Sequence, residues 1–410
     1  MKKIIISLTV IYIAVQLAAQ TPAQIEKTVR SVADNILSGS SFKILNKKTG
    51  ESFDVADKSS GDPADLIIES PYNEWKYWNG VLNIAFDELG EALGDEKYKT
   101  YSSRNMQFAF DNMDFFAEHY NGENRWGYPF GLMFEHHQLD DCGAEGASLI
   151  QVYRREARKE YKDYIDKTAD HILNRQDKLE DGILCRTFPE EMTIWGDDLY
   201  MSIPFMARMG ALTGEKKYFD FSVQQVELFN KYLYNPNNYL YFHCYYDNIG
   251  ENGVAFWSRC NGWIIMGTVE LLKFLPEDHP GRETVIGLLD RQIRGLARYQ
   301  SAGGMWHQLL DKEDSYLESS STAMFVYGIA KGINEGWIDD RYAPIAIKGW
   351  RGLTEMITAD GRVKNICAGL NIYTDLAGYY NHPAPMNDIH GLGVVLLAGT
   401  EVMKLVGREE

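Results

Sequence analysis

Cysteine is scarce in this chain of 410 residues, and its placement excludes several classes of protein. Five cysteines stand far apart, at Cys142, Cys185, Cys244, Cys260 and Cys367, and no CxxC or Cys/His spacing of a zinc site occurs. One pair could be bridged in an exported protein, but small buried thiols are the ordinary alternative. We therefore expect a fold that does not depend on disulfides.

The motifs of nucleotide, nicotinamide and serine-hydrolase chemistry are also missing. The sequence has no Gly-x-Ser-x-Gly elbow and no Walker loop, and Gly391-Leu392-Gly393 lacks the third glycine of a dinucleotide fingerprint. His136 and Asp140 stand four residues apart, which could place two metal ligands on one helix face, but no third ligand is evident. We therefore predict a protein that uses no metal and no cofactor.

Positive charge is in deficit, with 41 Lys and Arg against 58 Asp and Glu and a net charge of −17. This balance argues against nucleic acid and anionic membrane surfaces as partners. Hydrophobic residues at 45% and charged residues at 24% are usual for a folded soluble protein. The aromatic share of 13% is high, and aromatic side chains suit the flat faces of sugars as well as a core.

Residues 1–20 have the pattern of a secretory signal peptide. Lys2 and Lys3 precede an apolar run that ends at Leu17, and two alanines follow. The run is shorter than the ~20 residues of a spanning helix, although an N-terminal anchor is the alternative. We expect no later stretch to be long enough to span a membrane. Residues 21–410 should then form one soluble domain, periplasmic or secreted, as a monomer or a homodimer.

A pattern of about sixty residues recurs along the chain. A turn that ends near a tyrosine separates an apolar segment from an amphipathic one, and these tyrosines are Tyr98, Tyr161, Tyr218 and Tyr342. They are 63, 57 and 124 residues apart, so a degenerate copy is expected near His279. Residues 198–212 are apolar on nearly all sides, as in a buried helix, whereas residues 218–233 are apolar on one side.

Six helical hairpins of this kind account for the mature chain. Inner helices would form a core and outer helices a shell, which predicts an all-α ring, although an open array would fit the same pattern. A short β-hairpin is expected around residues 239–243. Pro204 should either kink the helix that contains it or lie in its first turn.

A polar residue recurs at the head of each predicted buried helix, at intervals of 57 to 68 residues: Asn79, Asp141, Asp198, Asn261, Ser320 and Asp388. Such side chains also cap helices, so capping is an alternative role for each. Tryptophans, histidines and an arginine flank these heads, namely Trp78, Trp195, Trp257, Trp263, His243, His307 and Arg259. In a closed ring all six heads would face one end, where this composition is typical of a carbohydrate cleft.

Two pairs of adjacent aspartates, Asp140/Asp141 and Asp197/Asp198, are the candidates for acid/base chemistry on a glycosidic substrate. Neighbouring carboxylates repel and apolar walls disfavour charge, so one pKa in a pair should rise. A carboxyl that is protonated near neutral pH can act as an acid. Arg259 could bind a substrate carboxylate through two hydrogen bonds, or it could form a structural ion pair.

Three longer motifs resemble those of the unsaturated rhamnogalacturonyl hydrolases, glycoside hydrolase family 105. They are residues 137–143 (HQLDDCG), 195–204 (WGDDLYMSIP) and 257–263 (WSRCNGW), and residues 314–325 fit as well. The resemblance extends from about Trp75 to Leu397. The unsaturated glucuronyl hydrolases of family 88 are related but match less well. The resemblance implies an (α/α)6 barrel, in agreement with the six hairpins.

The resemblance also implies a reaction. A 4,5-unsaturated uronic acid would be removed from the non-reducing end of an oligosaccharide produced by a lyase, with rhamnogalacturonan as the expected source. An aspartic acid protonates C4, water adds at C5, and the resulting hemiketal opens so that the glycosidic bond breaks. The alternatives are an inverting glycosidase that uses the same two aspartates on a saturated glycan, and a non-catalytic carbohydrate-binding protein.

Residue roles follow from the resemblance by position. Asp198 matches the general acid/base, and Asp141 matches the second aspartate, with Asp140 as a competitor one residue away. His243 matches a histidine near the substrate. Some family members are cytoplasmic, whereas this chain carries an export signal, and residues 242–247 depart from the form that the family leads us to expect.

The remaining predicted contacts form the wall of the substrate site. Arg259 and Trp263 match residues that contact the uronate, and Trp195 stands at the head of the second motif. His307, after Trp306, could hydrogen-bond a sugar or could be a packed histidine. The leaving sugar stays open, because fragments of rhamnogalacturonan, ulvan and arabinogalactan carry the same unsaturated cap.

Overall fold

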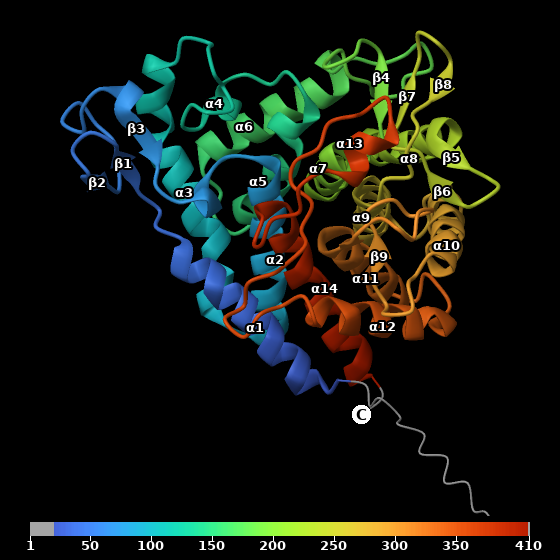
Figure 1. The fold of residues 1–410 in the computed structure, drawn as a ribbon. Helices are drawn as coiled ribbons and strands as arrows, with labels where there is room; N and C mark the ends of the chain where they lie inside the picture. Colours follow the sequence, from blue (N-terminus) through green and yellow to red (C-terminus); the bar gives the residue numbers. More distant parts are fainter. Residues whose placement is uncertain (1–19, 409–410) are drawn as a thin grey trace, which may run out of the picture.

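The computed structural model describes residues 20–408, which form fourteen α-helices and four small β-sheets around a central ring of helices (Figure 1). All of the predicted signal peptide except residue 20 lies outside the described residues. Export and the boundaries of the single mature domain therefore stay predictions.

Six helices form a closed inner ring: α2 (Tyr77–Leu93), α5 (Gly143–Tyr153), α7 (Asp198–Thr213), α9 (Ser258–Phe274), α11 (Ser319–Asn334) and α14 (Ile389–Gly407). Each contacts the next, and α14 contacts α2, which completes the circle. The ring helices are buried over most of their lengths, as the all-round apolar character of residues 198–212 predicts. The closed all-α (α/α)6 barrel is thus confirmed, and the open array is wrong.

Six outer helices cover the ring: α1 (Pro22–Gly39), α3 (Glu96–His119), α6 (Lys159–Asp170), α8 (Lys216–Leu233), α10 (Arg282–Arg298) and α12 (Ala343–Thr354). A π-helical turn, His171–Arg175, continues α6. The predicted tyrosines lie in the first turn of α3, α6 and α8 or directly before α12, and all four are buried. The degenerate copy near His279 leads into α10. Helix α1 packs against α14, so the first and last long helices make the sixth hairpin.

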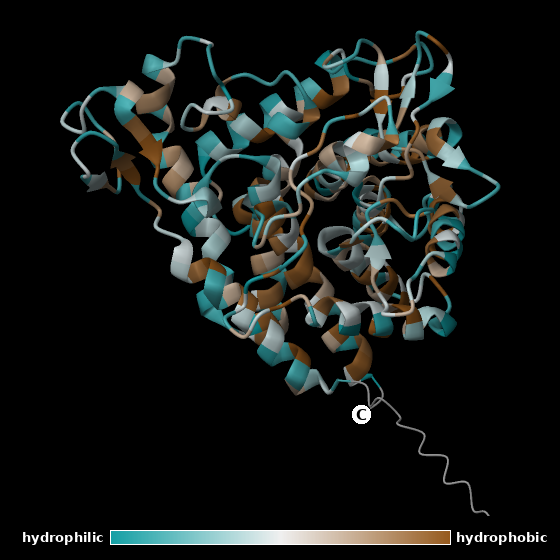
Figure 2. Cartoon of the chain, viewed as in Figure 1, coloured by the Kyte–Doolittle hydropathy of each residue, from teal (hydrophilic) through white to brown (hydrophobic). Residues whose placement is uncertain are grey.

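Helix α14 is long and apolar enough to cross a membrane by length and composition, contrary to our expectation from the sequence. Its most apolar window is 78% buried inside the protein, where it packs against α2 and α11. In Figure 2 the hydrophobic colour is concentrated on such interior helices, whereas the loops are mainly hydrophilic. The apolar surface of α14 therefore belongs to the core of the barrel.

All four sheets lie in segments that lead from an outer helix to the next inner helix. They are β1–β3 (Ile44–Asn46, Ser52–Phe53, Leu66–Ile68), β4 with β7 and β8 (Thr193–Trp195, Cys244–Tyr246, Glu251–Asn252), β5 with β6 (Tyr234–Asn235, Leu240–Tyr241) and β9 with β10 (Trp306–His307, Leu317–Glu318). The pairing of β5 with β6 confirms the predicted hairpin. The short helices α4 (Gly131–Phe134) and α13 (Leu376–Tyr380) lie in such segments too. This end of the barrel therefore holds the longest connections.

The polar heads of the inner helices mostly do not cap them. Asp388 accepts a hydrogen bond from His390 N at the start of α14, as an N-cap does. Asn261 instead bonds the backbone N and O of Tyr241, which fixes the β5–β6 hairpin to α9. Pro204 lies in the interior of α7, beyond its first turn. All five cysteines are buried and free.

Glycine allows α5 and α7 to approach closely. A Cβ on Gly143 would overlap the backbone carbonyl oxygen of Met201, whereas a Cβ on the exposed Gly287 of α10 would meet nothing within 4 Å. We expect Gly143→Ala to lower the free energy of unfolding by about 1–3 kcal/mol or more, because backbone must move. We expect Gly287→Ala to raise it by about 0.5–1 kcal/mol. Denaturant titration measures both, and an unchanged stability of Gly143→Ala would contradict the close contact.

Candidate active site

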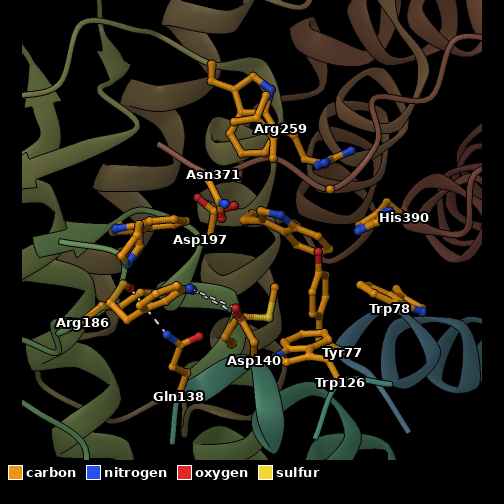
Figure 3. Close-up of a pocket in the computed structure, with 18 residues that line it drawn as sticks. Tyr77, Trp78, Trp126, Gln138, Asp140, Arg186, Asp197, Arg259, Asn371 and His390 are labelled. Atoms are coloured by element: carbon orange, nitrogen blue, oxygen red, sulfur yellow. Dashed lines mark hydrogen bonds and ion pairs between the residues drawn. The ribbon is translucent and has the colours of Figure 1, made fainter. Parts of the chain in front are cut away.

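The starts of the inner helices surround a cavity of about 280 Å³ (Figure 3). Helices α2, α5, α7, α9 and α14, or the residues directly before them, each contribute to its wall. A segment that follows α12, residues 369–371, closes one side. The lining combines carboxylates, arginines and aromatic side chains. The starts of five inner helices thus meet at one end of the ring, but the six polar heads themselves are not among the wall residues.

Within each aspartate pair, one carboxylate faces the cavity and the other lies behind it. Asp140 and Asp197 line the cavity, with side chains 15% and 12% exposed. Asp141 and Asp198 are fully buried and are not part of the wall. The two aspartates to which the sequence assigned catalysis therefore lie one residue away from those that a ligand in this cavity would meet.

Arg186 joins the two pairs. Its Nη1 and Nη2 donate to the two oxygens of Asp140 at 3.0 Å each, and its Nε and Nη2 donate to Asp198 at 2.7 to 3.1 Å. Its guanidinium carbon lies 4.4 Å from the centre of the Trp195 ring, which covers it. A backbone ladder between Arg186 and Thr193 places the arginine in front of α7. One buried cation thus fixes a carboxylate on the wall and another behind it.

Burial and charge act against each other in this cluster. Burial raises the pKa of Asp198 to about 6, although Arg186 acts in the opposite direction. Burial also disfavours the charge of Arg186, but Asp140 and Asp198 outweigh it and raise the pKa of the guanidinium. Asp141 is paired with Arg125 and accepts hydrogen bonds from the backbone of His137 and Gln138 at 2.8 and 2.9 Å. Both buried aspartates therefore have structural partners.

His243 lies behind the cavity wall, not on it. It is fully buried, and its Nε2 is 3.3 Å from Oδ2 of Asp197. The ring centres of Trp195 and Trp257 lie 5.5 and 4.6 Å from that of His243 and hold its plane. The expected contact between His243 and a substrate is therefore replaced by a contact with a carboxylate that lines the cavity.

Arg259 lines the cavity and is only 1% exposed. Its terminal nitrogens donate to the backbone oxygens of Cys367 and Ala368, and no Asp or Glu in residues 20–408 forms an ion pair with it. Burial acts against its charge, but nearby Cys367 and Glu318 raise the pKa of Arg259. The cavity therefore contains a buried cation whose charge no directly bonded carboxylate balances.

Of the other predicted residues, some line the cavity and some lie away from it. Trp195 and Trp263 line the cavity as expected. His307 does not: it belongs to β9, where it pairs with Leu317 of β10, and its Nδ1 lies 2.5 Å from the backbone oxygen of Ser315. His136 contacts Tyr164 at 3.2 Å, and burial lowers its pKa to about 2. Within residues 20–408, no group of three His, Cys, Asp or Glu side chains is placed to bind a metal.

Several wall residues were not predicted as ligands: Tyr77, Trp126, Gln138, Arg186, Asn371 and His390. Tyr77 and His390 lie within two residues of a helix head, so the same repeat could have identified them. Arg186, Trp126 and Asn371 lie in connecting segments outside the repeated pattern, where a single sequence gives no periodic signal.

Comparison with known proteins places this site in a family. The model of Glycosyl Hydrolase Family 88 matches residues 55–406. The unsaturated rhamnogalacturonyl hydrolase YesR of Bacillus subtilis is 29% identical over 269 residues, which cover 63% of this chain and 75% of that protein. An unsaturated 3S-rhamnoglycuronyl hydrolase of an Alteromonas species is 30% identical over 217 residues, 51% of each protein.

Solved structures share the fold. A possible family 105 member from Klebsiella pneumoniae superposes with a TM-score of 0.76 at 24% identity and covers 94% of both chains. A family 105 glycoside hydrolase from C. acetobutylicum gives a TM-score of 0.73 at 23% identity, covering 92% of this chain and 99% of that one. The similarity extends over nearly the whole barrel.

The ion pairs of Arg186 predict strong coupling between it and Asp198. Arg186→Met should lower the free energy of unfolding by about 3–5 kcal/mol, because it leaves a buried carboxylate unpaired. The double variant Arg186→Met/Asp198→Asn should lose clearly less than the sum of the two single variants. Denaturant titration of all four proteins gives the coupling, and additive losses would show that the pair does not act as a unit.

Proposed function

This chain belongs to Glycosyl Hydrolase Family 88, and from this we propose that it removes a 4,5-unsaturated uronic acid from the non-reducing end of lyase-generated oligosaccharides. The names of the two relatives support this reaction, because both are hydrolases of unsaturated uronyl or rhamnoglycuronyl groups. We take rhamnogalacturonan fragments as the first source to test, since the first of these relatives acts on an unsaturated rhamnogalacturonyl group.

The structural feature that best supports this reaction is the buried guanidinium of Arg259 on the cavity wall. A buried cation without a bonded carboxylate is costly, and an anionic ligand in the cavity would offset that cost. The C6 carboxylate of an unsaturated uronic acid is such an anion. The neighbouring carboxylates Asp140 and Asp197 supply the acid chemistry that hydration of a double bond needs.

We assign the general acid to Asp197, which revises the expectation for Asp198. Asp197 lines the cavity and forms no ion pair with an arginine among residues 20–408, so its carboxyl is available to a ligand there. Asp198 is fully buried, and Arg186 occupies both of its oxygens. A group that transfers a proton must come within hydrogen-bond distance of the reacting atom, and of the two aspartates only Asp197 lines the cavity that a substrate would enter.

The reaction then proceeds by protonation, hydration and ring opening. Asp197 gives its proton to C4, and the electron pair of the C4–C5 double bond forms the new C–H bond. Positive charge develops on C5 and the ring oxygen, and a water molecule adds at C5 as it returns a proton to Asp197. The hemiketal opens to a ketone at C5, and the hemiacetal left at C1 expels the leaving sugar. One water is consumed in all.

Asp140 is suited to a different role from Asp197. Two hydrogen bonds from Arg186 fix its carboxylate on the wall. A fixed negative charge stabilises the cation that develops on C5 and the ring oxygen. We therefore propose that Asp140, not Asp141, is the second functional aspartate, since Asp141 is buried against Arg125.

Aromatic side chains form the apolar part of the site. Tyr77, Trp78 and Trp126 line the cavity (Figure 3). Trp195 and Trp263 line it as well. Such rings pack on the C–H faces of a sugar and exclude bulk water, which strengthens the interaction of the substrate carboxylate with Arg259. In this way the site would bind one uronate ring, and the leaving sugar would lie toward the opening of the cavity.

We also propose that the protein is exported to the periplasm or the medium, because residues 1–20 have the composition of a signal peptide. Lyase products of a large polysaccharide would be met there. The mature protein would act as a monomer or a homodimer, without nucleic acid or membrane partners, and size-exclusion chromatography with light scattering distinguishes the two assemblies.

If Asp197 is the general acid, substitutions at Asp197 and Asp198 should have different effects on kcat. Asp197→Asn should reduce kcat at least about 100-fold, because an amide cannot supply the proton. Asp198→Asn keeps the shape of its site and should stay within about tenfold of the wild type. Turnover is followed by the loss of ultraviolet absorbance of the C4–C5 double bond in an unsaturated rhamnogalacturonan disaccharide. An active Asp197→Asn beside an inactive Asp198→Asn would reverse the assignment.

The role of Arg259 predicts dependence on the substrate carboxylate. Arg259→Gln should lower kcat/KM about 10- to 100-fold, the value of a hydrogen bond to a charged group. The wild type should lose a similar factor when the substrate carboxylate is replaced by its methyl ester. The variant should barely distinguish acid from ester, and a variant that still prefers the acid strongly would place the carboxylate elsewhere.

A further inference from the structure

Tyr379 lies directly behind His243, on the side away from Asp197. It belongs to the short helix α13 in the segment between α12 and α14, and it is 1% exposed. Its Oη is 2.7 Å from Nδ1 of His243. Tyr379 is absent from the cavity wall, so it would act on a substrate only through its neighbours.

The hydrogen bonds around Tyr379 decide the direction of the contact. The backbone N of Tyr373 donates to Tyr379 Oη at 3.4 Å, so the oxygen already accepts a hydrogen there. Within residues 20–408, the acceptor that the Tyr379 hydroxyl reaches is Nδ1 of His243. Burial raises the pKa of Tyr379, which keeps the hydroxyl protonated at neutral pH. The tyrosine therefore donates, and Nδ1 accepts.

A neutral imidazole with an acceptor Nδ1 carries its hydrogen on Nε2. In His243 this nitrogen is the one that lies 3.3 Å from Oδ2 of Asp197. The backbone N of Gly196 donates to the carbonyl oxygen of His243 at 3.0 Å, which ties the two segments together. The N–H of the ring therefore lies on the side of Oδ2 of Asp197, and within residues 20–408 neither buried atom has another hydrogen-bond partner. The other carboxyl oxygen, Oδ1, is left to carry the reacting proton.

We propose that Tyr379 is a positioning residue that holds His243 in the Nε2–H tautomer, so that the histidine donates to Oδ2 of Asp197 and leaves Oδ1 to protonate the substrate. This role rests on the proposed function of Asp197. Without the tyrosine hydroxyl, the histidine could carry its hydrogen on Nδ1, and a bare Nε2 would then face Asp197. The proton of the acid would be drawn toward Oδ2 and away from the substrate.

The tautomer is measured directly by ¹⁵N NMR on protein labelled in its nine histidines. A nitrogen that bears hydrogen and a bare nitrogen resonate far apart, and His243→Gln assigns the signals of His243. We expect the Nε2–H tautomer in the wild type and a shift toward Nδ1–H in Tyr379→Phe. An Nδ1–H tautomer in the wild type would overturn the proposal. The wild-type spectrum needs neither a substrate nor a Tyr379 variant, so it tests the tautomer independently of the proposed reaction.

Kinetics supply the second test. Tyr379→Phe should reduce kcat at least about tenfold with little change in KM, because the substrate does not touch this residue. Tyr380→Phe is the matched control. It removes a tyrosine hydroxyl from the same helix, but this hydroxyl donates to Asp314 at 2.7 Å and not to His243. An unchanged kcat in Tyr379→Phe, or equal losses in both variants, would overturn the role. A wild type without activity on unsaturated disaccharides would instead count against the proposed function.

Discussion

The active end of this barrel depends on one buried guanidinium. Arg186 lies under Trp195 and shares its hydrogen bonds between Asp140 on the wall and Asp198 behind it. Two aspartates from different inner-helix heads would repel each other in so dry a place without a cation between them. By holding Asp140 and the start of α7 together, Arg186 fixes the position of the neighbouring Asp197, whose side chain alone in that pair stays available for chemistry.

The closed ring explains why such a cluster can form. All connections from an outer helix to the next inner helix lie at one end, so the residues that need irregular backbone gather there. The segment between α12 and α14 makes two contacts at this end. Its backbone oxygens at Cys367 and Ala368 bind Arg259, and its Tyr379 bonds His243. The same segment therefore orients the cation that faces a uronate and the histidine that contacts the acid.

The sequence predicted the fold better than the site. A sixty-residue period and all-round apolar helices follow from packing, which constrains many residues at once, so the hairpins and the end of the ring at which their heads meet could be foreseen. The sequence could not predict which aspartate of each adjacent pair faces the cavity, because both members of the pair have the same side chain. Only the backbone at the start of α7 decides that Asp197 points into the cavity while Asp198 points behind it. Arg186 and Asn371 lie in connections without any period, and the structure alone brings them to the wall.

In the proposed reaction the double bond, not the anomeric carbon, is the site of attack. A carbon-linked analogue of the unsaturated uronoside, in which the bond at C1 cannot be hydrolysed, tests it most directly. If Asp197 protonates C4 and water adds at C5, the wild type should remove the ultraviolet absorbance of this analogue at a rate comparable to that for the natural oxygen-linked substrate. An enzyme that cleaves the natural substrate but leaves the absorbance of the analogue unchanged would contradict hydration of the double bond and favour the inverting glycosidase.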